Sequence, residues 1–457
     1  MNLDIYLAGR HIASTVPRSR GRRFTIEYST SVLADMPAES ILLSCSLPTP
    51  GPSGPGNARA FLEGLLPEGH ALEVMASRVR GVQLDSSDGS PAEPADVLNL
   101  LAAYGRECAG AIVLVPTGQD MPGAGHYREL NDRQVAGLIT NLPNNPLGSD
   151  LAAGIRMSLA GNQPKLLLAR LGERWCEPVD GAATTHIIKP TGVWPLSADN
   201  EAIVMGVARA VGLTQSATWV EDFGGTRALV AERFDRIVDP VAQTVTRRHQ
   251  EDMCQALGLR PREKYSIGRP SRRMATLLRA VPTAPGVDAR KLFEQTVFRT
   301  IVGDEDGHGK NYGLIIDDGE VDLAPLYDAL TTMVYPELSG KMGTPVGRQE
   351  NLAKVDLDAL IEEGRACGIP ERTSREIAVS LADRITTAVH RLPENGLDGV
   401  ALDAVSRTLT MRATRLMDGE PMGSPPAGSA LSTGRGRAAG TLDSATTVHV
   451  KASTSRR

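Results

Sequence analysis

The sequence contains few cysteines, and their arrangement says something about its surroundings. The five cysteines are scattered, odd in number and never arranged as Cys-x-x-Cys: Cys45, Cys108, Cys176, Cys254 and Cys367. This distribution argues against a disulfide framework and against a cysteine-based zinc site, and it is typical of a protein in a reducing compartment. We therefore expect a cytoplasmic protein whose cysteines pack as small hydrophobic side chains.

Long apolar runs and a strong net charge are also missing. No uninterrupted apolar segment approaches the length that crosses a bilayer, and the first residues show an early acid, Asp4, without the apolar region of a secretory signal. The net charge of −5 gives no reason to expect a membrane surface as a partner. The 457 residues, of which 41% are apolar and 23% charged, are enough for two or three globular domains.

The order of the sequence patterns divides the chain into four parts. Residues 1–125 mix strand and helix patterns, and residues 126–235 continue with a loop, several strands and an amphipathic helix. Helical periodicity dominates residues 236–417. Residues 418–457 are rich in Gly, Ser, Ala and Thr with scattered basic residues, so we expect this tail to be disordered.

The stretch with the clearest chemistry follows a predicted helix at residues 289–302. Glycines break the helical period around a charged loop in which Asp306 and Asn311 stand five positions apart, and Asp328 follows seventeen residues later. A phosphoryl-transfer site requires such a set, because the first Asp orients the attacking hydroxyl while Asn and the second Asp hold Mg²⁺ on the phosphates. The alternative is a polar turn, since these residues are common in turns.

Two upstream segments could contact phosphate groups. Loop 158–165 contains small residues and precedes a predicted strand, so its backbone N–H groups could cover a triphosphate, although a plain surface turn is the alternative. Lys189 ends a β-branched run and could reach the α- and β-phosphates, with Glu201 on the following helix holding it. Lys189 could instead protect an edge strand, and Glu201 could simply complement the helix dipole.

A third segment, residues 227–236, has the pattern of a strand that turns into a polar crossing. Backbone groups at such a crossing could bind adenine, with Phe234 against the ring. The alternative is a linker that leads into the helical part of the chain.

In this order the segments resemble a two-lobed kinase, and the Asp-x-His-x-x-Asn loop looks like the phosphoinositide-kinase branch because it lacks the His-Arg-Asp of ordinary protein kinases. More narrowly, residues 1–417 resemble the HipA family, the serine/threonine kinase toxins of bacterial HipBA toxin–antitoxin systems. The segments that carry this resemblance are 61–69, 104–111, 158–165, 186–189, 232–236, 249–258, 306–311 and 325–328.

The resemblance implies an α+β, two-lobed protein-kinase-like fold with a mixed α/β N-terminal lobe and an all-α C-terminal lobe. Residues 1–125 are then a HipA-like N-terminal subdomain. Residues 126–235 complete the N-terminal lobe with the phosphate-binding loop and the strand lysine. Residues 236–417 form the helical C-lobe with the catalytic and metal loops, and the 418–457 tail lies outside the resemblance.

The resemblance also implies roles for individual residues. Asp306 is the catalytic base, Asn311 and Asp328 hold Mg²⁺, and Ser158 is an autophosphorylation site whose phosphate would switch the kinase off by holding its loop away from ATP. The implied nucleotide contacts are Ala160, Gly161, Asn162, Gln163, Pro164, Lys165, Lys189, Glu232, Arg233, Phe234, His308, Asn311 and Asp328. Asn162 departs from the alanine common in the family, and Pro164 stiffens the loop.

The function implied by the resemblance is an ATP- and Mg²⁺-dependent protein serine/threonine kinase that acts as a growth-arresting toxin. Its substrate would be an aminoacyl-tRNA synthetase, and its partner a helix-turn-helix, HipB-like antitoxin that carries the contact with DNA. Two alternatives remain open at this point. One is a catalytically silent nucleotide-binding corepressor, and the other is a kinase for a small molecule or lipid.

Overall fold

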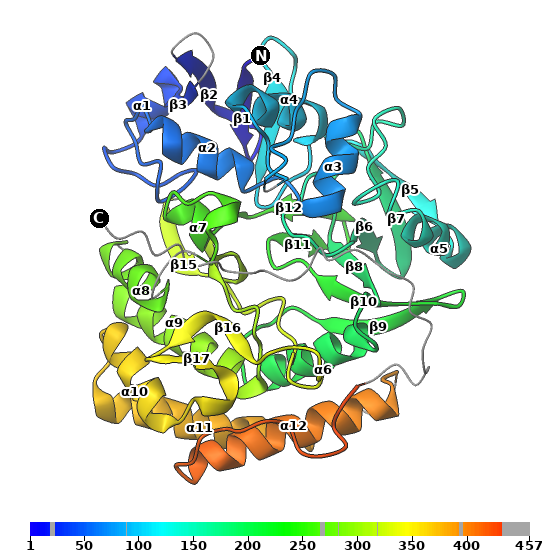
Figure 1. The fold of residues 1–457 in the computed structure, drawn as a ribbon. Coiled ribbons are helices and arrows are strands. Elements are labelled where there is room, and N and C mark those ends of the chain that lie inside the picture. Colours follow the sequence, from blue (N-terminus) through cyan, green and yellow to red (C-terminus); the bar gives the residue numbers. More distant parts are fainter. Residues whose placement is uncertain are drawn as a thin grey trace.

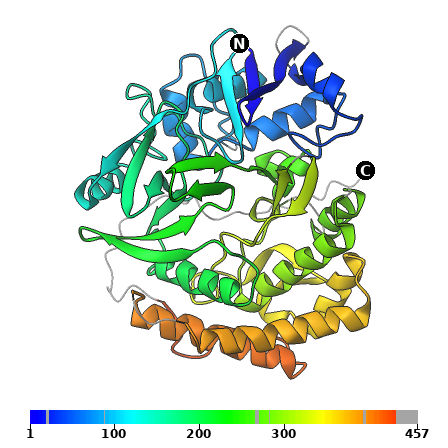
Figure 2. The same ribbon diagram turned by 180° about the vertical axis from the view of Figure 1, so that it is seen from behind.

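The computed structural model describes residues 1–18, 23–87, 89–265, 270–281, 283–317, 319–392 and 396–431. In Figure 1 an N-terminal subdomain lies at the top, a large antiparallel sheet at the right, and the helices of the C-terminal lobe at the left and bottom. Each of the three parts has its own buried hydrophobic cluster. Seen from behind, in Figure 2, the large sheet lies between the N-terminal subdomain and the lowest helices.

The N-terminal subdomain is a four-stranded antiparallel sheet covered by helices. Its strand order is β3-β2-β1-β4, so that the first strand of the chain pairs with a strand more than a hundred residues later. Helices α2 and α4 pack on this sheet and bury Phe61 and Leu101 completely. The elements are β1 (Leu3–Leu7), β2 (Arg10–Arg18), β3 (Arg23–Tyr28), α1 (Thr30–Asp35), α2 (Pro55–Glu63), α3 (Gly69–Ser77), α4 (Pro94–Tyr104) and β4 (Ile112–Pro116).

The large sheet has six antiparallel strands in the order β5-β7-β6-β8-β10-β9. Its central strands are apolar on both faces, and Leu166, Leu167 and Leu168 are completely buried. Helix α6 follows β8, packs on β9 and β10, and buries Ile203 and Val207 in the core of the C-terminal lobe. The elements are β5 (His126–Leu130), α5 (Asp132–Thr140), β6 (Leu166–Leu171), β7 (Arg174–Val179), β8 (His186–Pro190), α6 (Ser197–Ala210), β9 (Thr218–Phe223) and β10 (Thr226–Glu232).

The C-terminal lobe contains the predicted series of helices, with α9 buried at its centre and α10, α11 and α12 packed around it. Its helices are α7 (Met253–Ala256), α8 (Pro270–Ala280), α9 (Pro285–Val302), α10 (Leu357–Ala366), α11 (Glu371–Val389) and α12 (Gly399–Met417). Three short 3₁₀ helices are η2 (Pro261–Glu263), η3 (Gly309–Asn311) and η4 (Leu352–Lys354).

The expectation that this lobe is entirely helical is wrong. A three-stranded sheet, β13-β14-β15, and two hairpins, β11-β12 and β16-β17, interrupt the helices. These strands have at most six residues, too few for their alternation to stand out from helical spacing, and Leu314 to Ile316 are buried on both faces of the sheet. The strands are β11 (Arg236–Asp239), β12 (Thr244–Arg247), β13 (His249–Asp252), β14 (Gly313–Asp317), β15 (Glu320–Leu323), β16 (Lys341–Val346) and β17 (Gln349–Asn351).

The expectation of a disordered tail from residue 418 also needs correction, because residues 418–431 pack on the C-terminal lobe. The backbone N–H of Met422 donates to Val355 O at 2.9 Å, and that of Leu431 donates to Val334 O at 2.8 Å. Met422 and Leu431 are buried in the main hydrophobic cluster, which offsets the entropy of ordering a segment rich in Gly and Pro. Residues 432–457, the remainder of the predicted tail, lie outside the described residues.

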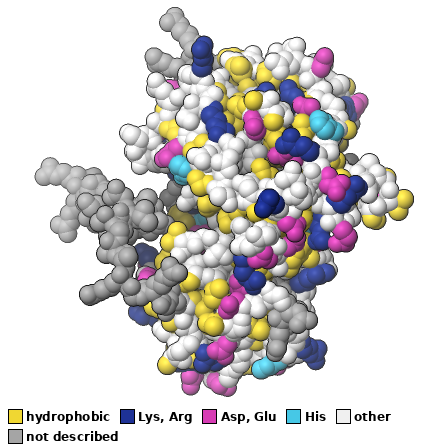
Figure 3. All heavy atoms as spheres, turned by 90° about the vertical axis from the view of Figure 1, so that its right-hand side faces the viewer, with side chains coloured by type: hydrophobic (Ala, Val, Ile, Leu, Met, Phe, Trp, Pro, Cys, Tyr) yellow, Lys and Arg dark blue, Asp and Glu magenta, His cyan; other side chains and the backbone are white. Residues whose placement is uncertain are grey.

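Two properties of the described chain concern possible surfaces. None of its helices combines the length and the apolar character that crossing a membrane requires. On the face shown in Figure 3, the right-hand side of Figure 1, basic and acidic side chains of the described residues are interspersed rather than gathered by sign.

Candidate active site

Lys189 lies in the middle of the large sheet. Its strand β8 pairs with β6 on one side and with β10 on the other, so the alternative of an edge-strand lysine is excluded. The side chain is buried, its Nζ lies 2.7 Å from Glu201 Oε1 on α6, and it also contacts the carboxylate of Asp328. The predicted pairing of Lys189 with Glu201 is therefore confirmed, and a residue from the C-terminal lobe joins the pair.

Burial and charge together set the protonation of this cluster. Burial favours the neutral form of Lys189, but the carboxylates of Asp328 and Glu201 outweigh it and hold the pKa of Lys189 above its usual value. Burial also opposes ionisation of Asp328, yet Lys189 keeps the pKa of that carboxyl well below its usual range. Burial raises the pKa of Glu201 to about 7 against the effect of Lys189. At neutral pH the cluster therefore presents an ammonium group beside an ionised carboxylate.

Asp328 occupies a sterically unfavourable backbone conformation. Its φ is +53°, a left-handed value that costs free energy in a residue with a Cβ. Arg299 holds the segment there, because its Nη2 donates to Tyr327 O at 2.6 Å and its Nη1 to Asp328 O at 3.2 Å. Asn311 Nδ2 adds a longer contact of 3.4 Å to Asp328 O. The predicted metal ligands Asn311 and Asp328 are thus neighbours.

The same arginine fixes the loop that carries the predicted base. Arg299 lies near the end of α9, forms a buried ion pair with Asp304 and donates to Asn311 O at 3.0 Å. Burial raises the pKa of Asp304 to about 6, although Arg299 opposes this shift. Asp304 Oδ1 accepts the backbone N–H of Asp306 at 3.0 Å. The Arg299 guanidinium therefore connects the loop from Asp304 to Asn311 with the segment of Tyr327 and Asp328.

Gly303 makes the sharp exit from α9 possible. Its φ is +82°, and a Cβ at this position would lie 2.5 Å from Met333 Cγ. Glycine alone avoids both the left-handed strain and the clash. The Gly303 carbonyl accepts a hydrogen bond from Thr332 Oγ1 at 2.8 Å, which ties the helix end to the segment after Asp328.

Asp306, His308 and Asn311 lie on one tight turn. The N–H of His308 donates to Asp306 O at 2.7 Å, and the N–H of Asn311 donates to His308 O at 2.9 Å. The carboxylate of Asp306 is 55% exposed, whereas His308 is buried with its Nε2 3.6 Å from Asp306 Oδ1. Burial lowers the pKa of His308 and favours the neutral imidazole. The carboxylate of the predicted base is therefore open to solvent.

Asn311 carries the observation that bears on a metal ion. Its Oδ1 is buried and has no hydrogen-bond partner within the described part of the chain, although its Nδ2 faces Asp328 O. A buried orphan oxygen on a residue that contacts Asp328, whose carboxylate is ionised, fits Mg²⁺, which takes one or two carboxylates together with substrate phosphates. No group of three or more His, Cys, Asp or Glu among the described residues could hold a metal alone. The donor set therefore fits a metal that arrives with phosphates.

The predicted phosphate loop folds back on itself next to this cluster. Lys165 is buried and its Nζ donates to Ala160 O at 2.7 Å. Burial lowers the pKa of Lys165 to about 8, and the positive charge of Lys189 adds to this effect. Gly161 has a φ of +112°, and its carbonyl accepts the N–H of Glu68 at 3.1 Å. The three residues between Gly161 and Lys165 are exposed: Asn162, Gln163 and Pro164.

Ser158, the predicted autophosphorylation site, is completely buried at the start of this loop. Its Oγ donates to Leu65 O at 2.8 Å, and its N–H donates to Glu107 O at 2.8 Å. Both acceptors belong to the N-terminal subdomain. The hydroxyl can therefore receive a phosphate only after this part of the loop leaves its position.

The predicted adenine segment divides between two environments. Glu232 is exposed, and its carboxylate accepts the N–H of Ala217 at 2.7 Å. The Phe234 ring stacks on Tyr327, the residue before Asp328, with centroids 5.2 Å apart. The structure thus places Phe234 next to the segment that carries Asp328, a predicted metal ligand.

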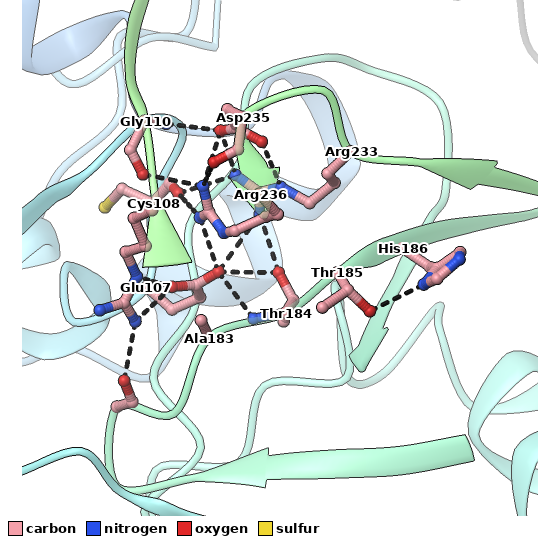
Figure 4. A network of polar contacts seen from close by, with 12 residues as sticks. Glu107, Cys108, Gly110, Ala183, Thr184, Thr185, His186, Arg233, Asp235 and Arg236 are labelled. Carbon is pink, nitrogen blue, oxygen red and sulfur yellow. Dashed lines mark hydrogen bonds and ion pairs between the residues drawn. The ribbon is translucent and has the colours of Figure 1, made fainter. Parts of the chain in front are cut away.

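The expectation that Arg233 contacts the nucleotide needs correction for its side chain, which is bound inside the protein. As Figure 4 shows, its guanidinium lies in a buried polar network with Glu107, Asp235 and Arg236. Arg233 Nη2 bonds Asp235 Oδ2 at 2.8 Å, and its backbone N–H donates to Thr185 O at 2.9 Å. These donors are engaged inside the protein, so the side chain does not contribute to the expected nucleotide contacts.

Two residues of the site were missed from the sequence. Arg299 interrupts an apolar helix one turn before the charged loop, and a charged residue among apolar ones at such a place is a sequence signal that could have found it. In the structure its side chain is buried. Asn200 is buried on α6, and its side-chain amide bonds both Thr331 N and Thr331 O, at 3.0 and 2.8 Å. Its role depends on the packing of α6 against the C-terminal lobe, which local sequence does not reveal.

The fold and the site together define a class, a two-lobed kinase-like protein in which a strand lysine contacts an aspartate of the C-terminal lobe next to the loop of residues 306–311. The chain belongs to the HipA family. Residues 3–115 match the HipA N-terminal domain, and residues 157–389 match the HipA-like C-terminal domain.

Individual relatives span nearly the whole chain. The Y4mE protein of Sinorhizobium fredii is 35% identical over 405 residues, covering 87% of this chain and 93% of the relative. The serine/threonine-protein kinase toxin HipA of Shewanella oneidensis is 26% identical over 407 residues, covering 85% of this chain and 88% of the relative. A solved structure of Shewanella oneidensis HipA with HipB and operator DNA has a TM-score of 0.75 at 24% identity, covering 91% of this chain and 99% of that chain. That likeness supports the two-lobed fold.

Proposed function

We propose that this protein is an ATP- and Mg²⁺-dependent protein serine/threonine kinase. The observation that carries the proposal is that four residues from three separate segments of the chain lie close together. Lys189 contacts Asp328, Asp328 lies beside Asn311, and a single turn joins Asn311 to Asp306. Phosphoryl transfer depends mainly on positioning and on charge stabilisation, and these are the groups that it requires.

Each group has a role that follows from its environment. Lys189 and Lys165 supply positive charge for the phosphates, and Asn311 Oδ1 and the Asp328 carboxylate would hold Mg²⁺. The metal, when bound, neutralises negative charge on the phosphates. Asp306 is open enough to accept the proton of a substrate hydroxyl. Lys189 and Asp328 contact each other directly, so the same two side chains would hold the phosphates and the metal on adjacent sides.

The adenine site proposed for the segment from Glu232 to Phe234 rests on backbone groups. Phe234 is anchored on Tyr327, so a nucleotide held at this crossing would also stabilise the conformation of Asp328. This link couples nucleotide binding to the placement of the metal ligand.

The cellular role proposed here is that of a growth-arresting toxin. The Shewanella oneidensis relative is named a serine/threonine-protein kinase toxin, and the solved complex contains HipA, HipB and operator DNA. By analogy, the partner of this chain is a HipB-like helix-turn-helix antitoxin that carries the DNA contact. The substrate class that the family resemblance suggests is an aminoacyl-tRNA synthetase.

Ser158 is proposed as the site at which the kinase switches itself off. A phosphate adds about −1.5 to −2 charges, and the buried pocket that now holds the Ser158 hydroxyl offers it the carbonyl oxygens of Leu65 and Glu107. Oxygen acceptors repel a phosphate, so the modified loop would stay outside. A Ser158→Ala variant should lose self-labelling and remain active longer, whereas undiminished self-labelling would place the phosphate elsewhere.

The test of the kinase activity is transfer of the γ-phosphate from labelled ATP to proteins of a bacterial lysate. Wild-type protein and an Asp120→Asn control, which changes an exposed aspartate after β4, should label a protein band. Asp306→Asn should bind ATP but lose the label by about 10²-fold or more. Label in a lipid or small molecule, or no transfer by any of the three proteins, would contradict the proposal.

A further inference from the structure

Residues 260–265 connect the N-terminal subdomain to the loop that carries Asp306. Arg260 makes two contacts with the Glu63 carboxylate, at 2.5 and 2.7 Å. Lys264 Nζ lies 2.7 Å from Glu68 Oε2. Glu63 is the last residue of α2 and Glu68 directly precedes α3, so this part of the N-terminal subdomain holds residues 260–265 by two ion pairs.

Tyr265, at the end of this stretch, has its ring enclosed by three neighbours. The ring meets His308 edge-on, with centroids 5.1 Å apart, and Lys264 Nζ lies 5.5 Å from the ring centroid. On another side the backbone of Gly343 approaches so closely that a Cβ there would lie 3.0 Å from Tyr265 Cε1. The residue is 43% exposed overall, yet its orientation is fixed.

This orientation directs the Tyr265 hydroxyl to the predicted base. Its Oη donates to Asp306 Oδ1 at 2.9 Å, a good hydrogen-bond distance. His308 Nε2 is farther from the same oxygen, at 3.6 Å. Burial raises the pKa of Tyr265, and the negative charge of Asp306 raises it further, so the hydroxyl remains a donor throughout the neutral range.

We propose that Tyr265 is a positioning residue for phosphoryl transfer. It holds Asp306 through Oδ1 and leaves Oδ2 for the hydroxyl that is to be phosphorylated. The inference rests on the proposed kinase function and extends it, because it names a side chain that orients the base. A carboxylate on a turn can rotate, and fixing one oxygen removes that freedom before the substrate binds.

The N-terminal subdomain has a direct part in this arrangement through Glu68. Its carboxylate pairs with Lys264, next to Tyr265, and its backbone N–H donates to Gly161 O of the phosphate loop at 3.1 Å. One residue of the N-terminal subdomain therefore contacts both the segment that carries Tyr265 and the proposed phosphate loop. Glu68 should influence turnover although it lies outside the set of reacting groups.

The experiment compares Y265F with Y127F by steady-state ADP release, using myelin basic protein as the acceptor. Both variants lose a hydroxyl from a tyrosine that is partly buried, and Tyr127 Oη donates to Ala183 O at 2.9 Å, so Y127F controls for the loss of a tyrosine hydrogen bond. Y265F should lower kcat about tenfold or more while KM for ATP changes by less than about twofold. Y127F should leave both constants unchanged.

The possible results separate this inference from the kinase proposal. If wild-type protein releases no ADP, the proposed function fails and the inference fails with it. If wild-type protein is active and Y265F has an equal kcat, the inference alone fails. A higher kcat in Y265F would also overturn it, because the hydroxyl would then be blocking the base rather than orienting it.

A second variant covers the case in which Y265F unfolds. E68Q retains the size of the side chain but removes the charge that holds Lys264, so it should lower kcat in the same direction by a smaller factor. The Y265F/E68Q double variant should lose little more than Y265F alone, because both changes act through one hydroxyl. Independent, multiplicative losses would contradict the proposed route.

Discussion

The buried network around Glu107 gives the sharpest prediction about stability. Glu107 is 1% exposed, and its carboxylate forms ion pairs with Arg233, Arg236 and Arg247. Figure 4 shows Arg233 and Arg236 in this network. Thr184 donates two hydrogen bonds to Glu107 Oε1, from its Oγ1 at 2.7 Å and from its backbone N–H at 3.0 Å. The change Glu107→Gln keeps the shape of the side chain but leaves these buried cations with one fewer anion.

The size of the effect follows from the charge environment. Burial opposes ionisation of Glu107, but the three arginines outweigh it and lower its pKa from 4.5 to about 2. Such a shift corresponds to about 3 kcal/mol of folding free energy at neutral pH. Breaking a buried ion pair from one side typically costs about 3–5 kcal/mol. Since domains are stable by only about 5–15 kcal/mol, the variant should lose a large fraction of its stability.

The assay is urea unfolding followed by the fluorescence of the three tryptophans. The matched control is Glu129→Gln, which removes an exposed partner of Arg174 at 3.3 Å and should cost less than about 1 kcal/mol. Because the folded-state pKa of Glu107 is depressed, its contribution is complete above pH 4.5 and is lost as the pH falls towards 2. Equal losses in both variants, or a Glu107→Gln deficit that does not shrink below pH 4.5, would refute the reasoning.

Three further predictions concern the site. Because burial and Lys189 lower the pKa of Lys165 to about 8, its charge is present below that pH, so kcat/KM for ATP should fall above pH 8 in the wild type and lose this limb in Lys165→Met. Arg299→Lys should lower kcat about tenfold or more in the ADP-release assay, since lysine cannot bind Asp304 and the carbonyl oxygens of Tyr327 and Asp328 together. Unchanged turnover would contradict this bridging role of Arg299. Gly303→Ala should cost more than about 1 kcal/mol in urea unfolding, and a neutral result would contradict the steric argument.

Much of the candidate site could be predicted because its segments follow one another along the chain in the order found in two-lobed kinases. The spacing of Asp306, Asn311 and Asp328 is local, and a family resemblance connected them to Lys189, which lies more than a hundred residues earlier. The alternative readings of Lys189 depended on whether β8 is an edge strand, and only the pairing of β8 with two neighbours decides that question.

What the sequence did not reveal depends on contacts between distant segments. Tyr265 carries no local pattern, and the position of Arg299 within an apolar helix does not reveal its partners; each acquires its role from the loop that folds against it. Arg233 lies in a segment that was expected to bind adenine, but its guanidinium binds two acids, Glu107 and Asp235, and the carbonyl oxygen of Cys108 inside the protein. Residues 418–431 have the composition of a disordered tail, yet Met422 and Leu431 pack in the hydrophobic core of the C-terminal lobe.

The central claim is that Lys189, Asp306, Asn311 and Asp328 serve one ATP and its metal ion. The most direct measurement is a crystal structure with a non-hydrolysable ATP analogue and Mn²⁺, in which anomalous scattering locates the metal. We expect the anomalous peak to be bound by Asn311 Oδ1 and the Asp328 carboxylate, with phosphate oxygens on the metal and Lys189 beside them. A nucleotide and metal bound away from these side chains would contradict the account.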